Sequence, residues 1–454
     1  MKTKTSAPES QAAPAAAGEL TPLFEMPADF ACVPEITTLP QLAAHLKVAA
    51  KVEMCTIPPY LYAAYSIRTK GYSQWSPGVG AFRTLLGIAI EEMLHLCLVR
   101  NLLLAIGEDT VFASPNFIPS FPGPLPHHTP RLELHLERLS KKLVREKFMP
   151  LELPEPRSEY YEEEPPVREY RTLGEFYRRI RDGFVYLDGE IDWANCNKDR
   201  QYHRGYWNQN GGGSTLLVTD LPSALNALDT IIDQGEGADP KKGTVPKNPV
   251  KPVPGLEEYT HYEKFRRMSE GIEGIGAVDG TREDSINIDT TLAVGVLVTD
   301  PHLDAVDQRE HPALHALTTL FNAAFTCTLH LLDELYATPV TDTTPKEFVS
   351  HRYHLERTFV SSMQGILYPI AELLTRTPTG RTRRINGRQE PEYAGPPFEF
   401  HAFGHGGYEG WRIKPELHDR CLRAISYFPE LGGEDGVLRQ IALLPDVSAA
   451  GSGS

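Results

Sequence analysis

The stretch LLGIAIEEMLHLCLVRNLLLAIG, residues 85–107, is the part of the sequence that decides the fold. Almost every position in it is apolar, so it predicts a helix over about residues 79–106 that is buried on nearly all sides. Gly107 follows the last apolar residue and is typical of a helix end. Glu92 and His95 lie inside this helix, three residues apart and therefore on one face. Because a buried charge is normally paired or bound to a metal, this pair predicts a buried polar site.

The preceding segment, KVEMCTIPPYLYAAY at residues 51–65, is similarly apolar and carries one carboxylate, Glu53. It predicts a helix over residues 39–69. Pro58 and Pro59 predict a kink or a locally broken turn in this helix, because proline cannot donate to the helical hydrogen-bond ladder. Strand signals are sparse throughout the chain, so the fold class is mainly α.

Further along the chain, helices are predicted over residues 172–188, 220–236 and about 256–270. The helix at 220–236 ends on Glu236, and the last one contains a second Glu-x-x-His motif, Glu258 to His261. Two such motifs are no excess over chance in a chain with 16 histidines. Their context therefore has to carry the argument.

The order of these residues along the chain matches a known arrangement of helices. Di-metal four-helix bundles take one Glu from each of two helices and one Glu-x-x-His motif from each of the other two. The midpoint between residues 53 and 92 falls in a turn at Gly71–Ser73, and that between residues 236 and 258 falls in a Pro/Lys-rich loop at 237–255. In each antiparallel helix pair the two ligand positions are equally far from the connecting turn, so they are expected to lie side by side. The predicted metal ligands are Glu53, Glu92, His95, Glu236, Glu258 and His261.

Such a ligand set favours two divalent cations. Four carboxylates and two imidazoles would repel one another without cations, and two divalent ions would balance the four negative charges. Oxygen-rich ligation with imidazole suits iron or manganese, whereas zinc prefers fewer ligands. Iron is the expected metal and manganese the alternative.

Simpler interpretations exist for the residues in the two apolar helices. Glu53 or Glu92 would also fit as a core carboxylate paired with Arg83 or Arg100. His95 alone would more often be a hydrogen-bonded core histidine. The metal site is favoured over these alternatives only because all the ligand types occur together, in the chain order that di-metal four-helix bundles require.

The remaining candidates have alternatives of the same kind. Glu236 lies between two glycines, where a helix C-cap loop would also fit. Glu258 would be favoured near a helix N-terminus by the helix dipole. Tyr60, seven residues after Glu53 and on the same face, either lines a substrate pocket or belongs to the core. Glu91 points away from Glu92 and is expected to support the site or form a salt bridge.

Composition excludes several other functions. The formal net charge is −15 and the pI about 5.6, which argues against a nucleic-acid or anionic-membrane surface. No apolar run approaches the length that spans a bilayer. The N-terminal residues lack the apolar region of a secretory signal, and three of the cysteines lie in apolar helical runs, so a reducing cytoplasm is expected. An arginine cluster at residues 381–388 is interpreted as a solvated loop.

The chain length and its Pro-rich segments predict the domain organisation. We expect a leader at residues 1–38, a metal-binding bundle at 39–272 with insertions at 107–170 and 237–255, a C-terminal helical region at 273–430, and a tail at 431–454. The first insertion includes a short amphipathic helix predicted at about residues 131–147.

Several segments together resemble a known family. KVEMCTIPPYLYAAYSI, IAIEEMLHLCLVRNLLLAIG, TLGEFY, LDTIIDQGEG, EEYTHYEKF and the later AGPPFEF are similar to the ferritin-like domain of the iminophenylpyruvate dimer synthase type. That family occurs in violacein and indolocarbazole pathways, and this chain resembles its stand-alone members. The resemblance implies a ferritin-like four-helix bundle with long insertions and an additional C-terminal helical region.

The resemblance also implies a function. It indicates a di-iron oxidoreductase or oxygenase that uses dioxygen on a small, amino-acid-derived aromatic or imine substrate, with oxidative coupling as one reaction. The alternatives are an iron-oxidising or iron-binding protein, and a metal-free scaffold on the same fold. The expected partners are a small-molecule substrate and a second copy of the chain in a homodimer, with no nucleic acid and no membrane.

Overall fold

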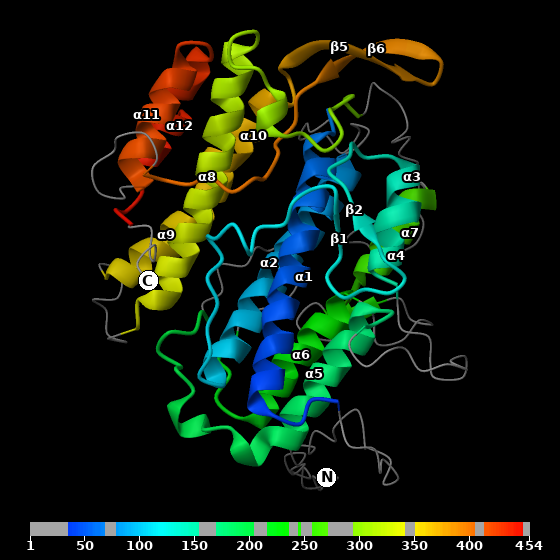
Figure 1. Cartoon of the computed structure of the whole chain (residues 1–454), viewed down its shortest axis with the longest axis vertical. Helices are drawn as coiled ribbons and strands as arrows, with labels where there is room; N and C mark the ends of the chain where they lie inside the picture. The colour runs from blue at the N-terminus through cyan, green and yellow to red at the C-terminus, as the bar shows by residue number, and fades with distance from the viewer. Residues whose placement is uncertain are drawn as a thin grey trace, which may run out of the picture. The chain divides into compact units, whose positions relative to one another are not determined.

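Two long apolar helices form the centre of the fold (Figure 1). The computed structural model describes residues 35–68, 79–153, 169–203, 216–235, 244–246, 257–270, 294–340, 350–404 and 413–447. Helix α1 spans Leu39–Tyr65 and helix α2 spans Val79–Ala105. The two helices run antiparallel, since Lys47 pairs with Glu108 while Thr56 bonds to Glu92.

Local sequence explains where α1 begins and how it continues. Thr38 accepts a hydrogen bond from the backbone of Gln41, whose side chain bonds back to Thr38, which is a capping box. Helix α1 continues through Pro58 and Pro59, so the two prolines do not end it. Neither proline donates an N–H group, so the carbonyls of Met54 and Cys55 lose their helical donors. Burial of almost the whole last half of α1 compensates for this loss.

Helices α5 (Leu173–Leu187) and α6 (Leu221–Gly235) complete the four-helix bundle. They pack against each other, α5 against α1 and α6 against α2 (Figure 1). Thr172 caps the start of α5 by accepting a hydrogen bond from the backbone of Glu175. The bundle therefore takes its fourth long helix from the segment predicted at 172–188, and not from the segment predicted at 256–270.

Helix α7 starts later than the sequence predicted. It spans His261–Glu270, and the residues before it form strand β4 (Glu257–Tyr259), which pairs antiparallel with β3 (Thr244–Pro246). Glu258 therefore lies in a strand, opposite Val245. The expectation that Glu258 and His261 share one face of a helix is wrong, because strand pairing holds the backbone extended up to Tyr259.

The first insertion contains short elements that pack on α7. Strands β1 (Gly123–Pro124) and β2 (Glu133–Leu134) pair with each other. A short helical run follows: α3 (Lys141–Leu143), the π-helix η1 (Val144–Phe148) and α4 (Met149–Leu151). This run packs against α7, and it lies further along the chain than the amphipathic helix predicted at 131–147. Single 3-10 turns follow α5 at Asp188–Glu190 and Trp193–Asn195.

A second group of helices comes from the last third of the chain. These elements are a 3-10 turn (Leu303–Ala305), α8 (Pro312–Ala337), α9 (His351–Ser362), the π-helix η7 (Met363–Leu367), α10 (Tyr368–Leu374), α11 (Ile413–Ile425), a 3-10 turn (Pro429–Gly432) and α12 (Val437–Ala442). Helix α8 packs against α9, α10 and α11. It is joined to α2 through Arg100 Nη1, 2.6 Å from Asp333 Oδ1, and through the Tyr336 hydroxyl, which donates to the Cys97 carbonyl at 3.1 Å.

Strands β5 (Pro378–Ile385) and β6 (Arg388–Tyr393) form a hairpin where the sequence predicted an irregular loop. Asn386 and Gly387 both have positive φ and make its turn. Arg383 on this hairpin pairs with Glu392 at 2.9 Å. The mainly α class is confirmed. In the described part of the chain, no helix combines the length and the apolar character that crossing a bilayer requires.

Candidate metal centre

Two groups of buried metal-ligand side chains lie between α1, α2, α4 and α7. The first group is Glu53, Glu92 and His95, and the second is Glu92, Glu152 and His261. In each group the ligand atoms lie within 4.8 Å of one another, and all the side chains are buried. Glu92 belongs to both groups, so the two candidate ion positions share one carboxylate.

The distances show how Glu92 faces both groups. Its Oε2 lies 3.7 Å from His95 Nδ1, while its Oε1 lies 2.9 Å from His261 Nδ1. Glu53 Oε2 is 3.5 Å from His95 Nδ1, and Glu152 Oε2 is 3.6 Å from His261 Nδ1. Each imidazole therefore turns the same nitrogen, Nδ1, toward a pair of carboxylates.

The far nitrogen of each imidazole is held by a second side chain. His95 Nε2 lies 3.0 Å from Gln234 Oε1, and His261 Nε2 lies 2.7 Å from Glu91 Oε2. Since these oxygens accept hydrogen bonds, the proton belongs on Nε2, which leaves Nδ1 as a lone-pair donor. Lys264 Nζ donates to the same Glu91 oxygen at 2.7 Å and offsets its charge. Such outer contacts fix the tautomer and orientation of metal-binding histidines.

Hydroxyl groups hold the carboxylates of the cluster. Thr56 donates to Glu92 Oε2 at 3.0 Å, Tyr60 donates to Glu152 Oε1 at 2.5 Å, and Tyr177 donates to Glu53. Tyr60 was expected either to line a pocket or to belong to the core. It is fully buried, packs against Phe148 and Phe265, and acts on the cluster through Glu152.

Burial and mutual charge shift the pKa values of this cluster. Burial and the neighbouring charge of Glu92 raise the pKa of Glu53 to about 8. Burial alone would lower the pKa of His95, but its bonds to Glu53 and Glu92 raise that pKa to about 10. Burial alone would raise the pKa of Glu91, but Lys264 and His261 lower it to about 2. The shifts of Glu53 and His95 both favour the protonated form of the group.

The cluster fits a pair of divalent ions. His261 Nδ1 is fully buried and makes no hydrogen bond, although two carboxylates surround it. A buried lone pair among carboxylates is costly unless a cation or proton occupies the space. Arg100, the alternative partner for these carboxylates, pairs with Asp109 and Asp333, and Arg83 is exposed. Carboxylate and imidazole donors suit iron or manganese.

The structure brings together four of the six predicted ligands: Glu53, Glu92, His95 and His261. Glu236 lies outside the described residues. The backbone of Glu258 is in β4, and its side chain is not described.

Sequence reasoning missed Glu152, which is the carboxylate beside His261. The signal was available, since Glu152 follows the apolar run from Phe148 to Leu151, in the same kind of context that singled out Glu53. Tyr177 and Gln234, which bond to the ligands, left no signal that distinguishes them from core residues.

Comparisons with known proteins agree with this geometry. Residues 46–270, the part of the chain that holds the whole cluster, match the family model described as ferritin-like. The chain is 28% identical to dichlorochromopyrrolate synthase of Lentzea aerocolonigenes, over 80% of this chain and 36% of that protein. It is 26% identical to 2-imino-3-(indol-3-yl)propanoate dimerase of Chromobacterium violaceum, over 79% of this chain and 33% of that protein.

The resemblance to the iminophenylpyruvate dimer synthase type is therefore confirmed. The chain spans about a third of the length of these curated relatives. Among solved structures, a ferritin-like protein from Caulobacter vibrioides is 23% identical, covering 75% of this chain and 96% of its own, with a TM-score of 0.48.

Proposed function

We propose that this chain is a non-haem di-metal oxidoreductase. The observation that carries the proposal is the shared carboxylate, because Glu92 faces two complete groups of buried ligands. Glu53 and His95 would hold one ion, and Glu152 and His261 the other, with Glu92 between them. Glu236 remains a further candidate, because its neighbour Gly235 lies beside Glu152. Two divalent ions, iron or manganese, would supply redox chemistry with dioxygen as co-substrate.

The protein's own residues prepare this site in three ways. Gln234 and Glu91 hold the imidazoles so that their Nδ1 atoms face the carboxylates. Tyr60 and Tyr177 keep two carboxylates oriented by donating hydrogen bonds to them. Because every ligand is buried, water is largely excluded and electrostatic interactions inside the cluster are strong. Protons held on the ligands leave when metal binds, so loading releases protons.

The substrate class follows from the relatives and stays a proposal for this chain. One relative is named as the synthase of dichlorochromopyrrolate and the other as a dimerase of an indolyl imino acid. We infer that this chain oxidises a small, amino-acid-derived aromatic or imine substrate, with oxidative coupling of two such molecules as the first reaction to examine.

Metal analysis of the full chain tests the proposal. The protein is purified without chelator, reconstituted anaerobically with ferrous iron and analysed for metal, alongside Glu92→Gln and a control, Glu416→Gln. Glu416 is also a buried carboxylate, but it lies on α11, far from the cluster in the chain, and pairs with Arg420 and His401. We expect about two ions per chain in wild type and control, and a loss of metal in Glu92→Gln.

Oxygen uptake then separates the competing functions. Consumption of dioxygen that depends on an aromatic imino acid supports the oxidoreductase. Uptake that follows added ferrous iron alone, without oxidation of any such substrate, identifies an iron-oxidising protein instead. If no metal binds even after reconstitution, the redox function is wrong and a metal-free binding or scaffold role remains.

A further inference from the structure

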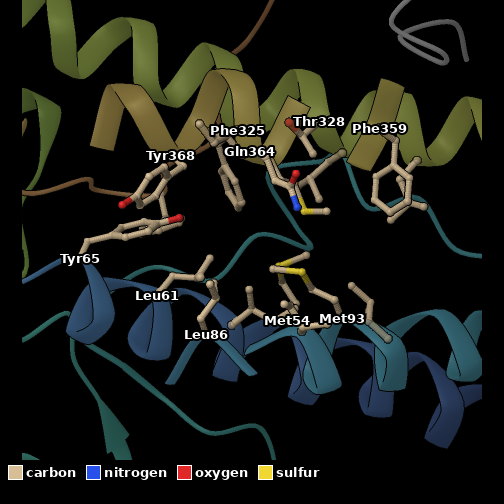
Figure 2. A pocket seen from close by; sticks show the side chains of 18 of the residues that line it. Met54, Leu61, Tyr65, Leu86, Met93, Phe325, Thr328, Phe359, Gln364 and Tyr368 are labelled. Carbon is tan, nitrogen blue, oxygen red and sulfur yellow. The ribbon is translucent and has the colours of Figure 1, made fainter. Parts of the chain in front are cut away.

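A large apolar cavity lies between the bundle and the C-terminal helices. Its volume is about 430 Å³, within the range of small-molecule sites. One wall comes from α1 and α2, and the other from α8, α9, η7 and α10 (Figure 2). Figure 2 shows Met54, Leu61, Leu86 and Met93 on the first wall, facing Phe325 on the second.

The cavity occupies a different face of α1 and α2 from the metal-ligand cluster. Met54 directly follows Glu53, and Met93 directly follows Glu92, and successive helical residues point about 100° apart. On α1 the cavity is lined by Met54, Ile57, Leu61 and Tyr65, which are three or four residues apart and so lie on one face of the helix. This face is separate from the one that carries Glu53. The same two helices therefore present ligands on one face and an apolar wall on another.

The lining indicates what the cavity can hold. No residue that lines it carries a charge, so a charged ligand would lose its hydration without gaining a partner. Apart from Thr328 and Gln364, the lining side chains are aliphatic, aromatic or sulfur-containing, and methionine sulfur makes favourable contacts with aromatic rings. Three methionines line the cavity: Met54, Met93 and Met363. An uncharged aromatic molecule matches this surface better than an anion or a cation.

The polar side chains that line the cavity are Tyr65, Thr328, Gln364 and Tyr368, and Gln364 carries the amide that would orient such a molecule. Gln364 lines the cavity and is an exposed residue, so it lies where the cavity opens to solvent. In Figure 2 this side chain extends from the C-terminal helices toward Met54 and Met93. The Thr328 hydroxyl, by contrast, already bonds to the Ala324 carbonyl and the Ser362 hydroxyl.

The backbone at this wall is unusual. Residues Met363–Leu367 form a π-helix, and Met363, Gln364 and Leu367 within it line the cavity. A π-helical turn is less stable than an α-helical one and occurs often at functional sites. Its position here is a second observation, independent of the cavity's volume, that indicates a binding site.

We propose that this cavity is a binding site for a small uncharged aromatic molecule, held between the two apolar walls and hydrogen-bonded by Gln364 at the mouth. It is a site separate from the metal-ligand cluster, and it does not depend on the proposed oxidoreductase activity. It also gives the C-terminal helices a function, since they build half of the site.

Methyl NMR of the full chain tests this without altering the cavity. Of the seven methionines in the chain, three line the cavity, while Met149 and Met268 lie elsewhere. With labelled methionine methyls, added indole is expected to shift the signals of Met54, Met93 and Met363 along one saturation curve, because its ring current acts at short range. Met149 and Met268 should not move. Indole-3-acetate, which has the same ring and a carboxylate, should bind at least about tenfold more weakly.

Three results would overturn the proposal: no shift up to the solubility of indole, equal shifts at all methionines, or equal binding of indole-3-acetate.

A cavity-filling variant provides the second test. Leu86→Trp places an indole side chain in the cavity, so added indole should bind at least about tenfold more weakly than to wild type. Leu443→Trp is the control, since Leu443 is 64% exposed and does not line the cavity. Far-UV circular dichroism and urea unfolding report whether each variant is folded. Unchanged indole affinity in a folded Leu86→Trp protein would contradict the proposed binding site. If that variant does not fold, the methionine shifts of the wild-type protein test the proposal instead.

Discussion

At the scale of single residues, Glu92 and Glu152 contribute differently to the cluster. Glu92 presents one oxygen to each imidazole, whereas Glu152 faces only His261. The pKa of Glu152 is raised by burial and by the charge of Glu92, while the two histidines hold the pKa of Glu92 low despite its burial. Removing the Glu152 carboxylate should therefore affect one ion position, whereas removing the Glu92 carboxylate should affect both.

The first prediction concerns Glu152→Gln. An amide is a weaker metal ligand than a carboxylate, so this variant should retain about one ion per chain where wild type holds about two. Elemental analysis after reconstitution measures this directly. Glu416→Gln is the matched control, since it also converts a buried carboxylate to an amide but lies on α11, and it should keep both ions. Two retained ions in Glu152→Gln would show that Glu152 is not a ligand.

At the scale of elements, the start of α7 positions His261. Thr260 is buried and its hydroxyl accepts a hydrogen bond from the backbone N–H of Glu263 at 3.3 Å. Its carbonyl accepts from the N–H of Lys264 at 2.8 Å, so Thr260 is the N-cap of the helix. The cap fixes the first turn, which carries both His261 and the lysine that balances Glu91.

Thr260→Ala should therefore destabilise the protein and weaken metal binding together. Loss of an N-cap hydroxyl costs about 1 kcal/mol of unfolding free energy. Urea unfolding measures that loss, and metal titration of the folded protein should show weaker binding at one of two positions. Thr260→Ser keeps the hydroxyl and should behave as wild type. If Thr260→Ala is less stable but binds metal normally, the cap does not position His261.

The long helices could be predicted from sequence because their apolar residues extend over several turns. Helices α1, α2, α5 and α6 are all found in the predicted segments. The hairpins could not be predicted from apolar periodicity, since β3, β4, β5 and β6 are short or polar. The Asn386–Gly387 turn was a local signal for the last hairpin, and the loop interpretation overlooked it.

The candidate site divides in the same way. Glu53, Glu92 and His95 were predictable because ionisable groups stand out in apolar helices. His261 was singled out by a motif whose helical reading is wrong, since its helix starts at His261 itself. Glu152 follows an apolar run, which was a local signal for a buried carboxylate, but its position beside His261 depends on tertiary packing of the first insertion on α7.

At the scale of the whole molecule, the buried cluster affects the stability of the bundle. Its ligands come from α1, α2, α7 and the residue that follows α4, so bound ions would link elements that are far apart in sequence. Without metal, the same carboxylates and imidazoles stay buried and depend on protons for charge balance. Metal binding at this cluster would therefore be coupled to folding.

Removing metal should therefore lower the stability of the full chain. A ligand present at a hundred times its dissociation constant stabilises the folded state by about 2.7 kcal/mol. Urea unfolding with ferrous iron under anaerobic conditions should have a higher midpoint than unfolding with a chelator, by an amount that grows with free metal. In Glu92→Gln the two midpoints should coincide, because the shared ligand is lost. A metal-dependent midpoint that persists in Glu92→Gln would mean that the stabilising ion binds outside this cluster.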